Sequence, residues 1–289
     1  MEVITNNKYV QRNFMIGDSW IYYKIYCGAY TADDILVKAI HPIVSDLLKN
    51  NIIEKWFFIR YNDPENHIRI RILLRTPDQL NSVIQKVKTY LAPFINSQEI
   101  WDVQLHTYKR ELERYGTNTM SISESLFFYD SEIIINGIAN IPNETEYFLF
   151  IIKIVFDHLS LFNYEDQEKM NFISSMRNGY RKEFNTNKTT TKSLDAKYRS
   201  LKEKIHKILG FNNSDLSYTT KNNELNYKNI KTTLVSYKKE GNLLVDSNEL
   251  LASYIHMTIN RSFKSKQRLY ELMIYDILYR VYKTKIALK

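Results

Sequence analysis

The chain has 289 residues and a formal net charge of +8, from 40 Lys and Arg against 32 Asp and Glu. Its 44% hydrophobic and 25% charged residues are typical of a globular protein. The 7 glycines argue against a glycine-rich phosphate-binding loop, and the single cysteine, Cys27, excludes an internal disulfide framework and a cysteine-based zinc site. The polar N-terminus and the lack of a long apolar run predict neither a signal peptide nor a membrane helix, so we expect a cytoplasmic protein.

Strand and helix patterns alternate in the first half of the chain. Aromatic and β-branched residues predict strands at 20–27, 56–61, 67–74 and 99–108. The turn residues 62–66 join the second and third of these strands into a hairpin. Apolar residues at helical spacing predict one helix from residue 31 to about 47 and another from residue 77 to about 91.

Helical patterns dominate the second half. Helices are predicted at about 121–137, 144–162, 166–184, 192–209, 247–262 and 265–285. The stretch 212–229 is rich in Asn, Ser and Thr, which predicts a long, flexible loop. We therefore expect one α+β domain over residues 1–289, with a mixed sheet packed against helices in its N-terminal half and a mostly helical C-terminal half.

Basic residues and isoleucines alternate strictly in the strand that begins at His67. Because a strand points alternate side chains to opposite faces, the isoleucines enter the core while His67, Arg69 and Arg71 share the other face. Two arginines about 7 Å apart repel each other unless an anion lies between them. Either cross-strand carboxylates neutralise them on a solvated face, or they form an anion site, because guanidinium groups bind carboxylates bidentately.

Two further groups of polar residues are candidates for chemistry. Arg110 and Arg114 are four residues apart, so a helical turn would stack them, and salt bridges with neighbouring glutamates are the simpler interpretation. His256 and Asn260 lie one turn apart on a predicted helix, and Arg261 follows them. A histidine on such a helix is more often structural than a general base, so neither group is decisive alone.

The order of these groups along the chain carries a family resemblance. The chain reads Trp56-Phe-Phe-Ile-Arg-Tyr-x-Asp63-Pro64-x-x-His67-Ile-Arg69-Ile-Arg71, then Tyr108-x-Arg110-Glu111-x-x-Arg114-Tyr115-Gly116, then His256-Met-x-x-Asn260-Arg261. In this order the motifs resemble the glutamate-elimination domain of class I lantibiotic dehydratases, also called the thiopeptide-type bacteriocin biosynthesis domain. The similarity extends from about residue 12 to about residue 285. Without the larger glutamylation domain of full-length dehydratases, the chain resembles a stand-alone member of a split system.

The resemblance implies a reaction and a set of site residues. In this family a partner domain uses glutamyl-tRNA to esterify Ser or Thr side chains of a precursor peptide, and the elimination domain expels glutamate to leave dehydroalanine or dehydrobutyrine. Catalytic roles are implied for Arg69, Arg71, Arg110 and His256, with Arg114 as the competing register for the third arginine. Substrate contacts are implied for His67, Arg114, Asn260 and Arg261. The resemblance implies no metal, nucleotide or organic cofactor.

The resemblance also implies partners. These are the precursor peptide, with its leader and its glutamylated core, a separate tRNA-dependent glutamylation protein, and a second copy of the chain in a homodimer. The leader could be held as an added strand on a sheet edge, for which 20–27 is one candidate.

β-Elimination suits these residue types. The α-proton of a peptide is weakly acidic, so the developing enolate needs fixed positive charge near its oxygen, which arginine supplies without losing its own proton. A histidine, with a pKa near 6.5, can serve as general acid or base, and the sequence leaves both roles open for His256.

Two other functions remain open. Relatives from thiopeptide pathways resemble this chain in size and join two dehydroalanines by a formal 4+2 cycloaddition to form a six-membered nitrogen ring. The net positive charge and the 22 tyrosines would also suit a non-catalytic peptide- or RNA-binding subunit, in which tyrosine rings stack on the bases of a single strand. The tyrosines fall on apolar stripes, which favours core packing, so we expect a lyase acting on a peptide.

Overall fold

A computed structural model describes residues 10–210 and 221–288, the first six residues of the second range by their backbone alone. Its strands are β1 (Asn13–Phe14), β2 (Trp20–Cys27), β3 (Ile53–Tyr61), β4 (His67–Leu74), β5 (Ile100–Leu105) and β6 (Tyr108–Lys109). Its helices are α1 (Ala32–Ile35), α2 (His41–Lys49), α3 (Leu80–Asn96), α4 (Leu112–Tyr115), α5 (Met120–Asn140), α6 (Glu144–His158), α7 (Asp166–Glu183), α8 (Lys188–Ile208), α9 (Lys221–Lys239), α10 (Ser247–Ser262) and α11 (Gln267–Ala287). A π-helical stretch, Leu36–Ile40, joins α1 to α2, and a 3-10 turn, Pro77–Gln79, precedes α3.

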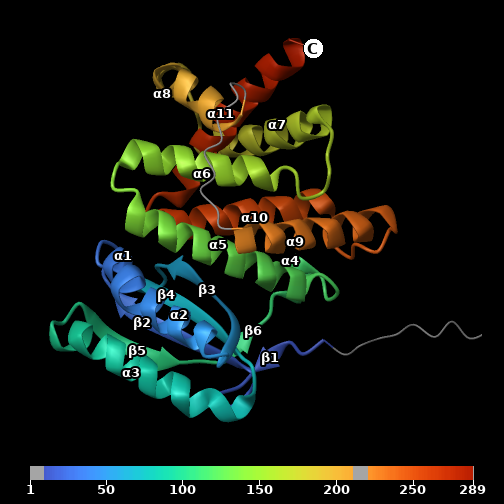
Figure 1. Cartoon of the computed structure of the whole chain (residues 1–289). Helices are drawn as coiled ribbons and strands as arrows, with labels where there is room; N and C mark the ends of the chain where they lie inside the picture. The colour runs from blue at the N-terminus through green and yellow to red at the C-terminus, as the bar shows by residue number, and fades with distance from the viewer. Residues whose placement is uncertain (1–9, 211–220, 289) are drawn as a thin grey trace, which may run out of the picture.

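A four-stranded sheet in the order β3-β4-β2-β5 lies below a layer of helices (Figure 1). The predicted α+β class is confirmed, but the sheet is antiparallel rather than mixed in every strand pair of the described residues. β2 and β3 run in the same direction and would form a parallel pair if they were neighbours. β4 lies between them, so each pairs with β4 in antiparallel orientation. β2 is therefore an interior strand, and β5 lies at the sheet edge where 20–27 was expected.

The isoleucine face of β4 is buried as the alternation predicts. Ile68, Ile70 and Ile72 are at most 2% exposed. Ile70 and Ile72 meet Ile43 of α2 and Val87 of α3 around a small internal gap. Burial of these side chains stabilises the sheet by about 1.5–3 kcal/mol for each residue and fixes which face of β4 turns away from the core.

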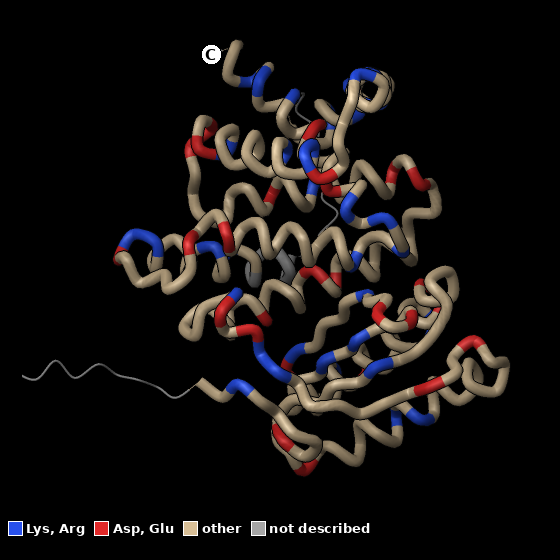
Figure 2. Tube along the Cα trace, turned by 180° about the vertical axis from the view of Figure 1, so that it is seen from behind, with Lys and Arg blue, Asp and Glu red and all other residues tan. Residues whose placement is uncertain are grey.

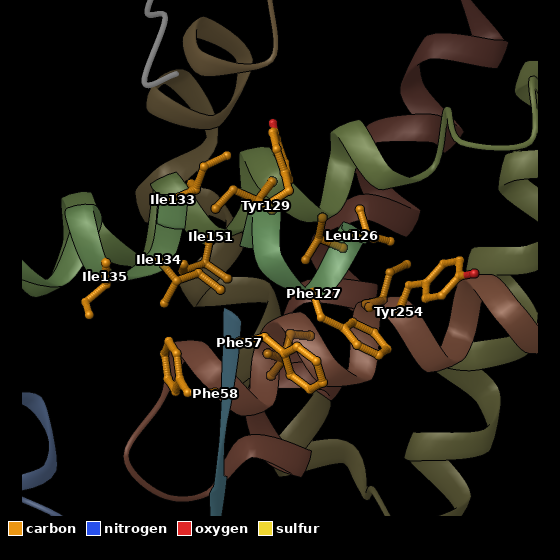
Figure 3. Packing of buried hydrophobic residues seen from close by; sticks show 14 of the residues in the cluster. Phe57, Phe58, Leu126, Phe127, Tyr129, Ile133, Ile134, Ile135, Ile151 and Tyr254 are labelled. Carbon is orange, nitrogen blue, oxygen red and sulfur yellow. The ribbon is translucent and has the colours of Figure 1, made fainter. Parts of the chain in front are cut away.

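The helical layer packs against β3, the opposite edge of the sheet from β5. Figure 3 shows Phe57 of β3 beside Phe127 of α5, with Tyr254 of α10 on the other side of Phe127, while Phe58 lies on the opposite side of the strand, below Ile134. The Phe57 and Phe127 ring centroids are 5.4 Å apart. The backbone N–H of Phe58 donates to Ser131 Oγ of α5 at 3.2 Å. This side chain therefore supplies a hydrogen-bond acceptor to a backbone donor of the edge strand β3.

One helix of the second half was not predicted. In the predicted loop 212–229, residues 221–229 form the start of α9, and the rest of that prediction lies outside the described residues. Tyr227, Ile230 and Leu234 form an apolar stripe on α9, with Ile230 and Leu234 buried. The Tyr227 hydroxyl also donates to a backbone carbonyl of α6 at 2.7 Å. Tertiary packing of this stripe therefore overrides the polar composition of the segment.

Many tyrosines belong to the core. Tyr22, Tyr23, Tyr108, Tyr115 and Tyr254 are each at most 5% exposed. Core packing accounts for them, which removes these rings from any surface that could stack on single-stranded nucleic acid. Across the described ranges, the helices are too short or too polar to cross a membrane.

Candidate functional site

The basic face of β4 lies between two strands that carry aromatic side chains. Each residue of this face has one directly opposite neighbour on β2 and one on β3, which gives three rows across the sheet. In the order β2, β4, β3 the rows are Tyr26, His67 and Tyr61; Lys24, Arg69 and Ile59; and Tyr22, Arg71 and Phe57. Directly opposite residues of paired strands point to the same face. Figure 2 shows the resulting basic positions on the strands of the sheet, beneath the helical layer.

Arg69 is held by a ring and by a neutral histidine. Its guanidinium lies 3.4 Å from the Tyr61 ring centroid, and its Nε donates to His67 Nε2 at 2.9 Å. His67 must then accept at Nε2 and donate from Nδ1 to the carbonyl of Glu65, 2.8 Å away. Burial lowers the pKa of His67, and the charge of Arg69 lowers it further, so the imidazole is neutral and orients Arg69 without competing for an anion.

Arg71 is nearly buried among three rings. Its guanidinium carbon lies 4.7 Å from the Tyr22 ring, 5.3 Å from Phe57 and 4.9 Å from Tyr108. Its Nε is buried and has no hydrogen-bond partner in the described part of the chain. Within the described residues neither Arg69 nor Arg71 forms an ion pair with an acid, so the cross-strand carboxylates that would explain them structurally are absent there. Stacking holds both cations and leaves their charge for an external anion.

Lys24 is a third cation of this face, which the sequence analysis did not select. It lies directly opposite Arg69 on β2, and burial and the charge of Arg69 lower its pKa. Like charges placed directly opposite each other destabilise a sheet. No acid pairs with Lys24 in the part of the chain that the structure describes, so Lys24 and Arg69 lie opposite each other without a neutralising carboxylate.

The two candidates for the third arginine differ sharply. Arg110 forms a bidentate ion pair with Glu124 of α5, with Nε 2.7 Å and Nη2 2.6 Å from its carboxylate oxygens. The Tyr108 hydroxyl donates to the same carboxylate at 2.9 Å. Because Glu124 is 1% exposed, Arg110 is committed to neutralising a buried charge.

Arg114 keeps its charge available. Its Nε donates to Ser253 Oγ of α10 at 3.0 Å, and its Nη1 lies 3.5 Å from the exposed carboxylate of Glu111. An exposed ion pair of this kind neutralises little. The Arg114 charge also lowers the pKa of His256, which places the two residues in the same electrostatic environment. The geometry therefore favours Arg114 over Arg110 as the third arginine of the site.

His256 is hydrogen-bonded to a buried carboxyl group. Its Nδ1 lies 2.6 Å from Glu271 Oε1 of α11, while Nε2 has no partner in the described residues. Burial, followed by the charges of Arg114, Arg268 and Arg261, lowers the pKa of His256 to about 4. Burial raises the pKa of Glu271 to about 8. Both shifts favour a neutral imidazole that shares a proton with the carboxyl group near neutral pH.

Asn260 and Arg261 have structural partners. The Asn260 side chain accepts from the backbone N–H of Arg60 and donates to its carbonyl, both at 2.9 Å, and so joins α10 to the edge of β3. Arg261 is fully buried, 4.8 Å from the Phe127 ring and 3.8 Å from Asp130. Burial lowers its pKa to about 10. Asn260 therefore positions α10, and substrate contact by Asn260 and Arg261 stays a prediction.

Tyr115 is influenced by the charges of cations from two regions, Arg71 of β4 and Arg114 and Arg261 near His256. Burial raises the pKa of Tyr115, and the charges of Arg114, Arg261 and Arg71 oppose that rise. Its ring stacks on Tyr254, with centroids 6.2 Å apart, two residues before His256 on α10. The Arg114 guanidinium carbon lies 5.4 Å from the Tyr115 ring centroid, while Arg71 and Arg261 act on Tyr115 through their charge.

Comparison with known proteins identifies the family. Residues 20–282 match the family described as the C-terminal part of lantibiotic biosynthesis dehydratases. The chain belongs to this family. It is 29% identical to the epidermin biosynthesis protein EpiB of Staphylococcus epidermidis, over 88% of this chain and 25% of EpiB. It is 26% identical to the nisin biosynthesis protein NisB of Lactococcus lactis subsp. lactis, over 94% of this chain and 26% of NisB. The chain thus spans about a quarter of the length of these relatives.

Two solved structures share the fold of this family member. The tRNA-dependent lantibiotic dehydratase MibB from Microbispora sp. 107891 matches with a TM-score of 0.68 at 18% identity, over 94% of this chain and 29% of MibB. The pyridine synthase TbtD from thiomuracin biosynthesis matches with a TM-score of 0.67 at 10% identity, over 92% of this chain and 100% of TbtD. The fold is therefore shared between proteins described as having different activities.

Proposed function

We propose that the chain eliminates glutamate from glutamylated Ser and Thr side chains of a ribosomally made precursor peptide, which leaves dehydroalanine or dehydrobutyrine. The observation that carries the proposal is the group of cations on one sheet face, Lys24, Arg69 and Arg71, which have no acid partner in the described residues. A substrate that brings one carboxylate and releases a second carries the opposite charge to this group of cations.

In the proposed reaction the arginines stabilise negative charge and His256 transfers the proton. A base removes the α-proton, its electron pair forms the Cα–Cβ double bond, and the Cβ–O bond breaks as glutamate leaves with the ester oxygens as a carboxylate. The arginines stabilise the enolate oxygen and the departing carboxylate, because both carry charge that develops in the transition state. His256 transfers the proton through Nε2, the ring nitrogen that Glu271 does not occupy.

Partners follow from the same proposal. The substrate is a precursor peptide with a leader and a glutamylated core, and its ester is made by a tRNA-dependent glutamylation protein. The described similarity to MibB, a tRNA-dependent dehydratase, supports this assignment.

Replacement of Arg69 or Arg71 by Ala tests the proposal. Each variant should fold and should leave chemically glutamylated peptide unconverted, with the rate reduced at least about 100-fold, because transition-state charge loses its stabilisation. Mass spectrometry of the peptide measures the conversion. Arg199→Ala is the matched control, since Arg199 is an exposed residue of α8 that pairs with Asp195 of the same helix. Full conversion by both site variants would contradict the assignment.

A 4+2 cycloaddition is the second candidate function. TbtD, a pyridine synthase, is matched over its whole length by this chain. The unpaired cations favour elimination instead, because joining two neutral dehydroalanines does not release a carboxylate from the reacting carbons. Incubation with a peptide that contains two dehydroalanines separates the candidates: a ring-containing product supports cycloaddition, and an unchanged peptide supports elimination.

A further inference from the structure

Glu271 is a buried acid with no assigned role. It lies on α11, is 1% exposed, and approaches His256 Nδ1 to 2.6 Å from a neighbouring helix. The His256 side chain is 29% exposed. The imidazole thus extends from a buried carboxyl group toward solvent, with Nε2 at its outer end. A carboxyl group hydrogen-bonded to one nitrogen of a histidine fixes the ring orientation and decides which nitrogen carries the proton.

The groups around this pair are mostly cationic. Arg268 Nη1 lies 3.7 Å from Glu271 Oε2, and Arg268 is itself held by Glu183 of α7. Arg114 of α4 and Arg261 of α10 act on His256, and Tyr275 of α11 is buried near Glu271. Glu271 Oε2 is buried and has no hydrogen-bond partner among the described residues. Within the described residues the imidazole is the hydrogen-bond partner of this carboxyl group, and the guanidinium of Arg268 has no acceptor atom, so a proton on Glu271 is shared with Nδ1.

We propose that Glu271 is the positioning residue of His256 and stores the proton that sets whether Nε2 acts as an acid or as a base. The inference rests on the proposed elimination. With two protons on the pair, the Glu271 hydroxyl donates to Nδ1 and Nε2 carries N–H. When Nε2 loses its proton, the Glu271 proton moves to Nδ1, which leaves a carboxylate, an Nδ1–H donor and a lone pair on Nε2.

The second state is the base for elimination. Its Nε2 accepts the α-proton, the electron pair of the C–H bond forms the double bond, and glutamate departs with the electrons of the Cβ–O bond. The Nδ1 proton returns to Glu271, and Nε2–H then passes its proton to solvent or to the departing carboxylate. Protons balance over the cycle without any oxidant or cofactor. The raised pKa of Glu271, about 8, places this exchange close to neutral pH.

Glu271→Gln tests the inference, because an amide keeps the size and a hydrogen bond but cannot store the proton. In the wild type, kcat/KM for a glutamylated peptide should rise with pH until the pair deprotonates near pH 8. In Glu271→Gln this limb should disappear and kcat at pH 7 should fall at least about tenfold, with KM changed less than about threefold. Glu249→Gln, an exposed change on α10, is the control and should keep the wild-type profile.

NMR of the full chain with labelled histidine separates this inference from the proposed function. The ring nitrogens of His256 should titrate near pH 8 in the wild type and not in Glu271→Gln. An unchanged pH profile of elimination in Glu271→Gln, or a wild-type ring that does not titrate between pH 7 and 9, overturns the inference. If the wild type shows the titration but does not release glutamate from peptide, the proposed function fails while the proton-sharing pair stands. Because the wild-type titration is measured alone, it decides the inference even if the variant does not fold.

Discussion

Arg69 and Arg71 hold their positions by stacking on aromatic rings rather than by pairing with acids. Rings contribute about 0.5–2 kcal/mol to each cation and occupy no guanidinium donor, and the one donor used in the described residues is Arg69 Nε, which His67 accepts. The alternation in β4 predicted their shared face, and the structure confirms that face. Tyr22, Tyr61 and Tyr108 could not be assigned to this role from sequence, because only strand register places them around the two arginines.

Arg110 and Arg114 have separable roles. Arg110→Met should lower the free energy of unfolding by about 3–5 kcal/mol, because it leaves the buried Glu124 carboxylate without its partner. Arg114→Met should change stability by less than about 1 kcal/mol, because its ion pair is exposed, and should abolish elimination. Urea denaturation and peptide mass spectrometry measure the two effects. A stable, inactive Arg110→Met protein beside an active Arg114→Met protein would return the third arginine to position 110.

The contact between Glu271 and His256 could not be predicted from the sequence. His256 was found because its motif precedes Asn260 and Arg261 in a recognisable order. Glu271 lies fifteen residues further on, in a helix whose spacing gives no sign that it faces α10. Only the packing of α10 against α11 brings the carboxyl group to the imidazole.

At the scale of elements, Asn260 joins a helix to a strand edge. Asn260→Ala removes both hydrogen bonds to the backbone of Arg60 and leaves two backbone groups without that partner. We expect a loss of about 1–3 kcal/mol in the free energy of unfolding and lower activity, since α10 carries His256. Thermal unfolding measures the loss, and Asn171→Ala on the exposed face of α7 is the control. Equal stability of the two variants would show that the contact does not hold α10 in place.

The close approach of α5 and α6 depends on Gly137. A Cβ atom at this position would collide with the Phe150 ring, so Gly137→Ala should destabilise the protein by about 1–3 kcal/mol. Gly179 in α7 has no neighbour within 4 Å of such an atom, and Gly179→Ala should stabilise its helix by about 0.5–1 kcal/mol. Calorimetric melting of the two variants checks the opposite signs. Melting of both in the same direction would contradict this packing.

Local patterns predicted most elements, and tertiary packing explains the exceptions. The 56–74 hairpin was predictable because turn residues separate an aromatic stretch from an isoleucine-rich one. The predicted strand 99–108 is divided into β5 and β6, which pair with different partners, β2 and β1. α9 was missed because its polar residues resemble a loop, while its apolar stripe becomes informative only against α5 and α6.

At the scale of the whole molecule, the candidate site lies where the sheet meets the helical layer (Figure 1). Cations come from β2 and β4, while Arg114 and His256 come from α4 and α10. Glutamate, the proposed product, should bind these cations and raise the melting temperature in a concentration-dependent way. Glutamine at equal ionic strength should raise it less, because it lacks the side-chain carboxylate. An equal shift in Arg71→Ala would show that glutamate acts elsewhere on a protein of net charge +8.

The measurement that tests the central claim most directly uses the wild-type chain and a chemically glutamylated precursor peptide without tRNA or a glutamylation protein. Mass spectrometry distinguishes elimination from hydrolysis, since hydrolysis returns the hydroxyl side chain and gives a product heavier by one water. We predict dehydroalanine or dehydrobutyrine together with free glutamate. A peptide that keeps its glutamate, or that regains Ser or Thr, would contradict the account.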